Sequence, residues 1–302
     1  MRRKPIGLPF FRFAALILAL AAVLSVMFYL RQTISPKPKT DTPAPPVQTP
    51  APTPEAAAPA PAAFPEPADT TPDEFVQRMK NTVTFVYDGD TIMTADGRRI
   101  RYVGVDTPER HEPFFDEATA LNKKLVEMRP VTLTECKKKP IDKYGRTLAT
   151  VSREGADVAE ALLTAGLAEP FHDRECIADC RPYWKWMLTG YQQRRGLFRQ
   201  RPPEPVPAVV ADRLFDRYGL VVGVVDNVRE STKAYHLNFG KDWTTDFSVT
   251  ISKKDIEPFL RDKLLPHSFV GLELTVFGKV VSSRGPRIFA VCPAQIVTVN
   301  AP

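Results

Sequence analysis

Thirteen prolines in residues 35–72 separate the parts of the chain that can form a compact fold from those that cannot. Proline lacks the backbone N–H that helices and sheet interiors need, and the surrounding Ala and Thr residues supply few large apolar side chains for a core. We therefore expect residues 32–72 to form an extended, semi-rigid linker. The folded part of the 302-residue chain should begin near residue 73, which leaves length for one or two domains.

An uncharged run at residues 13–30 precedes this linker and follows a basic tail of three arginines and one lysine. Its length approaches what a helix needs to cross a bilayer. The run is longer than the usual apolar core of a secretory signal, and no clean small-residue cleavage site follows it. We expect residues 1–31 to be an uncleaved transmembrane signal anchor rather than a cleaved signal, with the bulk of the chain exported. In a bacterium this would be a single-pass inner-membrane protein with its domains in the periplasm.

The net charge of +6 does not by itself indicate a surface for nucleic acid. Residues 1–31 contain five Lys or Arg and no acid, whereas the rest of the chain contains 36 basic and 35 acidic residues. Any anion-binding site beyond the N-terminus must therefore come from a local cluster of charges.

The pattern after the linker predicts a mainly β fold with flanking helices. β-Branched and aromatic runs indicate strands, and apolar residues at helical spacing indicate helices, the first with Asp116 as its N-cap. The expected strands are 81–87, 91–94, 99–105, 131–136 and 147–151, and the expected helices are 117–129, 157–165 and 182–195. This order suits a five-stranded OB-type barrel within residues 73–200.

Four prolines indicate a second linker at residues 201–210, and a further set of strands follows it. Residues 211–302 predict a second OB-like barrel, with strands at 218–225, 234–239, 245–251, 269–281 and 287–298 and a helix at 253–263. The aromatic and basic residues of this part could stack on a single-stranded nucleic acid and track its backbone, or the aromatics could simply fill the core. They are Tyr235, Phe239, Trp243 and Phe247, with Lys233 and Lys241.

Two acidic motifs and two arginines lie where the first set of strands is expected to end. The motifs are Asp88-Gly89-Asp90-Thr91 and Asp106-Thr107-Pro108-Glu109, and the arginines are Arg101 and Arg146. Taken alone, an Asp-Gly pair is a common turn and a strand arginine is commonly solvated. Together, carboxylates and guanidiniums in this order favour a hard cation bound beside a phosphodiester.

From about residue 82 to 198 the chain resembles the staphylococcal nuclease (thermonuclease) family. The resemblance rests on the two acidic motifs, on Arg101 five residues before Asp106, on Asp142-Lys143-Tyr144-Gly145-Arg146 and on the helical segment 161–168. It implies an OB-type barrel and calcium-dependent hydrolysis of phosphodiester bonds in DNA and RNA, without an organic cofactor.

The resemblance also implies a role for each site residue. Asp90 and Asp106 match calcium-binding carboxylates, and Thr107 matches a ligand that binds through its backbone carbonyl. Glu109 matches the residue that orients or deprotonates the attacking water, while Arg101 and Arg146 match the arginines that hold the phosphate. The remaining matches are Asp88, a supporting acid, and Lys143 and Tyr144, which lie along the nucleotide-binding edge. The chain departs from the family at Glu169-Pro170-Phe171, where a substrate-contacting tyrosine is missing.

The cysteines and histidines allow several interpretations. Cys176 and Cys180 could form a disulfide, could remain free thiols, or could join His172 in a metal site. Cys136 and Cys292 resemble ordinary strand residues. The four histidines are scattered, which argues against a histidine nucleophile or a histidine-ligated metal nuclease.

The sequence thus predicts a membrane-anchored, calcium-dependent nuclease that acts on DNA or RNA. One alternative is a barrel that has lost catalysis and only binds nucleic acid or protein, although such a module would not need all five of Asp90, Asp106, Glu109, Arg101 and Arg146. Another alternative is an envelope scaffold in which both barrels serve as interaction modules.

Overall fold

The computed structural model describes residues 71–300, which belong to one compact unit. The predicted anchor at residues 1–31, with its uncharged run at 13–30, lies outside the described residues, as does nearly all of the predicted linker. Within residues 71–300, no helix is both long enough and apolar enough to cross a membrane.

The described chain begins with a helix that the sequence did not predict, α2 (Pro72–Lys80). Thr71 and Glu74 form a reciprocal capping box, in which the Thr71 side chain accepts the Glu74 N–H and Glu74 accepts the Thr71 N–H at 2.9 Å. Pro72 fits at the first helical position because its missing N–H is not needed there. The last proline of the proline-rich segment, Pro72, is therefore the first residue of a helix and not part of an extended chain.

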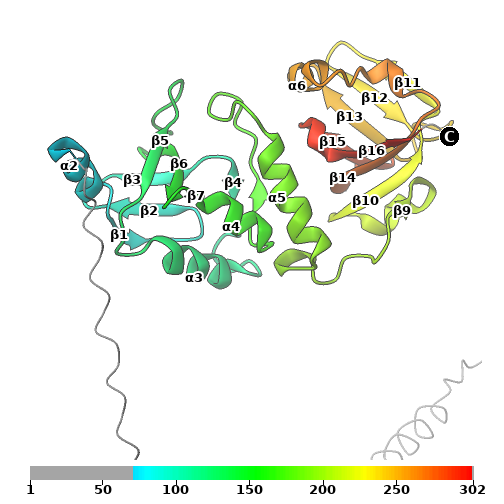
Figure 1. The fold of residues 1–302 in the computed structure, drawn as a ribbon. Helices are drawn as coiled ribbons and strands as arrows, with labels where there is room; N and C mark the ends of the chain where they lie inside the picture. Colours follow the sequence, from blue (N-terminus) through cyan, green and yellow to red (C-terminus); the bar gives the residue numbers. More distant parts are fainter. Residues whose placement is uncertain (1–70, 301–302) are drawn as a thin grey trace, which may run out of the picture. The chain divides into compact units, whose positions relative to one another are not determined.

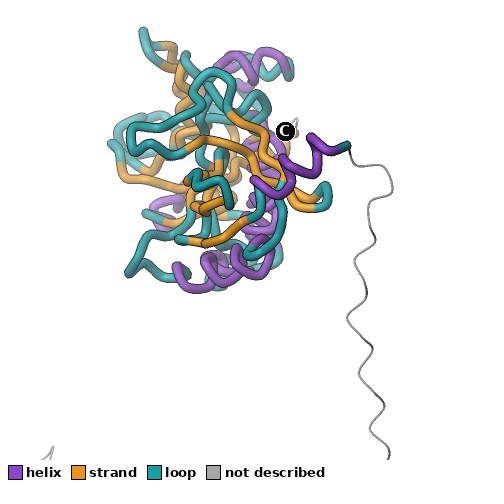
Figure 2. The backbone as a smooth tube through the Cα atoms, turned by 90° about the vertical axis from the view of Figure 1, so that its left-hand side faces the viewer, coloured by secondary structure: helices purple, strands orange, loops and turns teal. Residues whose placement is uncertain are grey.

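The first β region, residues 72–198, contains a six-stranded sheet with helices at its margins (Figures 1 and 2). After α2, its elements are β1 (Val83–Val86), β2 (Thr91–Thr94), β3 (Arg99–Tyr102), β4 (Val105–Asp106), α3 (Phe115–Val126), β5 (Thr132–Glu135), β6 (Thr147–Arg153), β7 (Ala156–Asp157), α4 (Val158–Thr164), β8 (Glu169–Pro170), α5 (Arg181–Gln192) and a 3-10 helix at Gly196–Phe198. The sheet order is β1-β2-β3-β6-β5, with β7 beside β6. The β3–β6 pair is parallel, and the other pairs are antiparallel.

The strand ladders of this sheet follow an open path. An isolated bridge joins Thr82 to Pro130, and the Val83 N–H donates to the Arg129 carbonyl at 2.9 Å, so the two ends of the path approach each other. No continuous ladder connects β1 with β5 among the described strands. The mainly β architecture with flanking helices is confirmed, but the closed barrel predicted from the sequence is not found.

Helix α3 begins differently from the prediction. Its N-cap is Phe114, in the left-handed region at φ 72°, and no side chain caps the helix. The prediction that Asp116 is the N-cap is therefore wrong, because Asp116 lies within the first turn, where its charge still favours the helix dipole. Helix α4 has a side-chain cap, since Asp157 accepts the Ala159 N–H at 2.8 Å.

The second β region, residues 206–300, is built on an eight-stranded sheet. Its elements are β9 (Val206–Pro207), β10 (Arg217–Val224), β11 (Asn227–Glu230), β12 (Ala234–Asn238), β13 (Ser248–Ser252), α6 (Ile256–Arg261), β14 (Glu273–Ser282), β15 (Pro286–Ala290), β16 (Ile296–Asn300) and 3-10 helices at Ala208–Leu214, Pro266–Phe269 and Pro293–Gln295. The order is β11-β12-β13-β15-β14-β10-β9, with β16 beside β14. Here too the described ladders follow an open path, so the predicted second barrel is not found as a closed structure.

The two β regions meet along α5 and β14. Phe277 of β14 lies 6.2 Å from Trp184 and 5.0 Å from Tyr191, measured between ring centroids, and it belongs to the same apolar core as these two residues. Arg201, in the connecting segment, donates to the Tyr191 and Gln192 carbonyls, which holds that segment against the end of α5.

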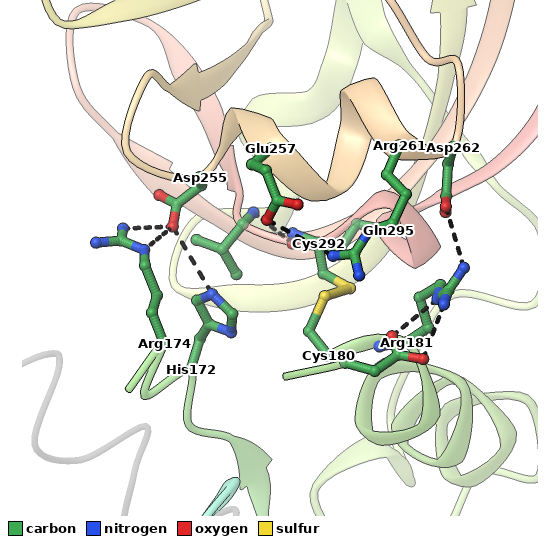
Figure 3. Close-up of a disulfide and its surroundings, with 12 residues drawn as sticks. His172, Arg174, Cys180, Arg181, Asp255, Glu257, Arg261, Asp262, Cys292 and Gln295 are labelled. Atoms are coloured by element: carbon green, nitrogen blue, oxygen red, sulfur yellow. Dashed lines mark hydrogen bonds and ion pairs between the residues drawn. A yellow bond between two sulfur atoms is a disulfide. The ribbon is translucent and has the colours of Figure 1, made fainter. Parts of the chain in front are cut away.

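Two disulfides link segments that are far apart in the sequence. They are Cys136–Cys176, within the first β region, and Cys180–Cys292, which joins the two regions (Figure 3). The predicted Cys176–Cys180 pair is therefore wrong, as is the interpretation of Cys136 and Cys292 as ordinary strand residues. The loop before α5 passes β5 on one side and the second β region on the other, so each of its cysteines finds a distant partner.

Ion pairs flank the Cys180–Cys292 bridge on both sides (Figure 3). Arg174 pairs with Asp255, and Arg181 donates to Asp262 at 3.0 Å. His172, which the sequence left open as a metal ligand, lies 3.8 Å from Asp255 instead. Covalent, ionic and aromatic contacts together fix the second β region against the first.

Candidate active site

Asp90 is the buried centre of the candidate site. Its Oδ2 accepts the Thr107 N–H at 2.8 Å and the Thr107 hydroxyl at 2.9 Å, and it lies 3.0 Å from Nη1 of Arg101. The side chain of Asp90 is almost fully buried. Burial raises the pKa of Asp90 to about 6, an effect that Asp88 increases and Arg101 opposes.

Arg101 joins Asp90 to Asp106. Its Nη2 donates to Oδ1 of Asp106 at 2.6 Å, and its Nη1 donates to the Tyr102 and Val105 carbonyls at 2.9 and 2.8 Å. The five-residue spacing places Arg101 in β3 and Asp106 at the end of β4, so the chain turns back on itself between them. The two carboxylates predicted as metal ligands thus reach a single guanidinium.

The loop that follows β1 fits closely against Thr107. A Cβ atom at Gly89 would lie 2.6 Å from Cγ2 of Thr107, so the loop needs glycine there to keep Asp90 and Thr107 in contact. Asp88 supports the same loop by accepting the Asp90 N–H at 3.1 Å. Asp88 therefore acts on the shape of this loop, and its role in catalysis stays a prediction.

Arg146 occupies a second position in the site, held by its own carboxylate. Nε donates to Oδ2 of Asp142 at 2.8 Å, and Nη1 lies 3.5 Å from the Thr91 hydroxyl, beside Asp90 in the sequence. Burial opposes this pair, yet the hydrogen bonds from Arg146 lower the pKa of Asp142. The four-residue spacing within the 142–146 motif was visible in the sequence, but the role of Asp142 was not predicted.

A cavity of about 440 Å³ brings these groups together. Arg101, Asp106 and Arg146 line it, as do Lys143 and the exposed ring of Tyr144. Lys143 and Arg146 both lie over that ring, at 4.9 and 5.4 Å from its centroid. Phe171 also lines the cavity, at the place where the sequence departs from the family.

Glu109 lies apart from the charge network described above. Its side chain is exposed, and its backbone N–H donates to Oε2 of Glu112 at 2.7 Å. Glu112, which the sequence did not single out, lines a second cavity of about 340 Å³ together with Asp106 and Thr107. The structure therefore connects Asp90, Thr107, Arg101 and Asp106 by direct contacts and brings Arg101, Asp106 and Arg146 to one cavity, while Glu109 is not among the described residues that line that cavity.

The second β region contributes to the wall of this second cavity. Lys279 of β14 lines it, and the Tyr218 hydroxyl of β10 donates to Oε2 of Glu169 at 2.8 Å. Glu169 is paired with Asp106 across the short β4–β8 ladder. These contributions were not predicted, because they depend on how the two regions meet.

The donor set fits a hard cation in its chemistry. Asp90 and Asp106 converge on one cationic group, Arg101, and the Thr107 backbone lies beside them. Calcium accepts such short carboxylates together with a loop carbonyl and water. Within residues 71–300, no group of three or more His, Cys, Asp or Glu side chains is arranged to hold a metal, so the remaining ligands would be carbonyl and water oxygens.

Comparison with known proteins places this site in a family. Residues 99–200 match the family described as "Staphylococcal nuclease homologue". Two endonucleases of Bacillus subtilis, one prophage-derived and one called YncB, are 35% and 38% identical over 137 residues. Each alignment covers 38% of this chain, but only 46% and 65% of the respective relative.

A third relative is matched over most of its length. It is an uncharacterized endonuclease of Escherichia coli O157:H7, 33% identical over 128 residues, which cover 41% of this chain and 79% of the relative. The matched family segment contains Arg101, Asp106 and Arg146, which the structure brings to one cavity. The chain therefore belongs to the family of staphylococcal nuclease homologues.

Proposed function

We propose that this protein is a membrane-anchored, calcium-dependent nuclease that hydrolyses phosphodiester bonds of DNA or RNA. The observation that carries the proposal is the convergence of Asp90 and Asp106 on Arg101, with Arg146 on the same cavity. The endonuclease names of the relatives support the substrate class. The second β region and the N-terminal part of this chain lie outside the matched family segment.

In this proposal Asp90, Asp106 and the Thr107 carbonyl hold the metal. Bound calcium would supply Lewis-acid polarisation of a phosphoryl oxygen and a site for the attacking water. The protein's own contribution is to fix the carboxylates, and the Thr107 N–H and hydroxyl do so for Asp90.

The two arginines would bind the phosphate. Asp142 orients the guanidinium of Arg146 through Nε, which leaves Nη1 and Nη2 without a carboxylate partner among the described residues and available to a bidentate phosphate contact at the cavity that Arg146 lines. Arg101 has the same planar fork but already bonds to Asp106. Because charge grows on the phosphoryl oxygens in the transition state, fixed donors of this kind stabilise it more than the bound substrate.

Glu109 is the proposed general base. Its side chain is exposed, so it can accept a proton from an attacking water near Asp106, either directly or through one intervening water. The contact between Glu109 and the attacking water needs to form only when substrate is bound. A carboxylate of this kind must be ionised to accept the proton from the attacking water.

Calcium dependence and metal ligation can be tested together on the purified full chain. Cleavage of DNA and RNA is measured with calcium or with a chelator, and calcium binding is measured by calorimetry. We expect no cleavage in chelator, and weaker calcium binding by Asp90→Asn and Asp106→Asn, with part of the lost rate restored by excess calcium. Cleavage that persists in chelator, or unchanged calcium affinity in both variants, would contradict the proposal.

The same experiment separates the nuclease from a catalytically silent binding module. A silent module would bind nucleic acid but would show no calcium-dependent cleavage by the wild-type chain. Arg101, Asp106 and Arg146 line one cavity, and Asp90 contacts Arg101 from the buried side, which favours the enzyme because binding alone does not need paired carboxylates there.

Membrane anchoring by residues 13–30 is a further part of the proposal. Two disulfides among the described residues support an exported location, because disulfides persist in oxidising compartments such as the periplasm. Protease added to intact spheroplasts should remove both β regions and leave a small membrane fragment. Full protection, or a soluble form that begins near residue 31, would contradict the anchor.

A further inference from the structure

The outer face of the sheet β11-β12-β13-β15 has an unusual row of side chains. Arg229, His236, Thr250 and Phe289 are register partners across these four strands. The residues that alternate with them, such as Leu237, Val249 and Ile288, are buried in the core of the second β region. The row therefore lies on the opposite side of the sheet from the core. Thr250 is covered there, whereas Phe289 is 51% exposed in the middle of the sheet.

A second row on the same face adds another arginine. Asn227, Asn238, Ser248 and Arg287 are register partners, each two residues from the first row. The partners within this row are neutral: Arg287 donates to the Ser248 hydroxyl at 2.9 Å, and Asn238 donates to Asn227 at 2.8 Å.

Two loops extend this face with an aromatic ring and a third arginine. Trp243, in the loop between β12 and β13, is 38% exposed, and the guanidinium carbons of Arg229 and Arg284 lie 4.9 and 5.7 Å from its ring centroid. We call Arg229, Arg284, Arg287, Trp243 and Phe289 the arginine face. Phe239 and Phe247 do not belong to it, because they pack on each other beneath the surface.

No carboxylate in residues 71–300 forms an ion pair with any of these three arginines. The acids of the second β region that form ion pairs do so with other bases: Asp255 with Arg174, Asp262 with Arg181, Glu230 with Lys253, and Glu257 with Arg261. Burial, followed by Arg284 and Arg229, lowers the pKa of Arg287. Burial, Arg287 and Arg229 likewise lower the pKa of His236, so the neighbouring arginines add to the effect of burial at both groups.

We propose that the arginine face binds single-stranded nucleic acid, with its arginines on the phosphates and its exposed rings against the bases. Unpaired cations on one surface favour a polyanion through counterion release. The exposed Phe289 and Trp243 distinguish the single strand from the duplex, since unpaired bases offer aromatic faces that a duplex hides.

The inference deepens the proposed function, because it assigns strand binding to a surface outside the matched nuclease segment. Only the statement that the bound strand is the substrate of the enzyme rests on the proposed function. Binding itself is measured without turnover, so the two proposals can fail separately.

The electrostatic part is tested by the salt dependence of binding. The full chain is titrated with a labelled oligothymidylate in EDTA at several salt concentrations, and the slope of log K against log[salt] is determined. Replacing two phosphate contacts in Arg229→Gln/Arg284→Gln should reduce the slope by about 1.4, at ~0.7 per phosphate for single strands. The matched control is Arg213→Gln/Lys254→Gln, which removes the same charge from exposed positions of the second β region and should leave the slope unchanged.

The stacking part is tested with Phe289→Thr, which replaces an exposed ring by a residue suited to a strand. Loss of one stacked base should weaken oligothymidylate binding by about 5- to 100-fold, since such stacking is worth ~1–3 kcal/mol and 1.4 kcal/mol is tenfold. The salt slope should not change. Circular dichroism confirms the fold of each variant.

Three results would overturn the proposal. One is an equal loss of slope in the control pair. The second is tight binding of a duplex of the same length that is insensitive to Phe289→Thr, which would identify a general polyanion surface. The third is wild-type binding by both arginine-face variants. A chain without nuclease activity that still shows the expected slopes would leave this inference intact and contradict only the proposed function.

Discussion

Arginine is used in opposite ways in the two β regions. In the candidate active site every arginine has a carboxylate: Arg101 contacts Asp90 and Asp106, and Arg146 contacts Asp142. On the arginine face the partners are neutral or aromatic, as with Arg287 on Ser248.

This difference indicates that the paired arginines serve the chemical step and the unpaired arginines serve substrate binding. A paired guanidinium is fixed in direction but contributes little net charge, which suits donors that must match one transition-state geometry. Unpaired guanidiniums contribute a positive potential that reaches a flexible polyanion and is screened by salt. We therefore expect changes in the active site to reduce turnover, and changes on the arginine face to reduce binding.

The strongest test of this division is the proposed general base. Glu109→Gln keeps the size of the side chain but cannot accept a proton, so kcat should fall by about 10²–10⁴-fold with little change in KM. Glu112→Gln is the matched control, because glutamine keeps an oxygen to accept the Glu109 N–H. Steady-state kinetics on DNA decide the matter, and equal losses in the two variants would remove Glu109 from its role.

The two disulfides should differ in their effect on stability. Replacing Cys180 and Cys292 by Ser opens a loop of 112 residues, and replacing Cys136 and Cys176 opens one of 40. On the chain-entropy account the losses in unfolding free energy are about 5 and about 4 kcal/mol, respectively. Denaturant unfolding measures both, and the Cys180–Cys292 variant should also lose coupling between the regions. A larger loss from the 40-residue loop would contradict the entropic ranking.

The same substitution should have different consequences in the two regions. Arg146→Lys keeps the charge but loses the planar fork, so kcat should fall by about 10²–10³-fold, the scale of one oxyanion donor. Arg284→Lys should leave oligothymidylate binding and its salt slope nearly unchanged, because charge alone is needed there. If Arg146→Lys retains turnover, or if Arg284→Lys abolishes binding, the division between geometry and potential is wrong.

The sequence predicted features that depend on residues close together in the chain better than features that depend on residues far apart. The Asp90 loop and the Arg101–Asp106 spacing are local features of the sequence, and the structure places these residues in contact. The cysteine partners lie 40 and 112 residues apart, so their connectivity follows from packing that no local pattern encodes.

The arginine face shows the same limit in the second β region. Arg229, His236 and Phe289 share a row only because four strands pair in one register, and β11 itself was missed by the pattern of apolar residues. The prediction from residues 233–247 identified Trp243 but also included Phe247, which is a core residue, and Phe239, which packs partly buried against the core. Alternation along one strand indicates two faces, but it does not say which face meets solvent.

The smallest expected effect concerns an acid of the first β region that forms no ion pair with arginine. Asp157 caps α4, and burial raises its pKa, with Glu160 adding to the rise and the Ala159 N–H opposing it. A raised folded-state pKa gives stability that is full below the unfolded pKa of ~3.9 and is lost as pH rises through the folded value. Asp142 behaves in the opposite way, because Arg146 helps to lower its pKa and its stabilisation is lost as pH falls.

Asp157→Asn keeps a capping oxygen but removes the titration, so its stability relative to wild type should increase between pH 4 and neutrality and then level off. Asp157→Ala loses the cap and should cost about 1 kcal/mol at all pH values where the cap forms. Denaturant unfolding at several pH values measures both differences. Parallel curves for wild type and Asp157→Asn would show that Asp157 does not titrate differently in the folded state, and the contrast between paired and unpaired acids in this region would then fail.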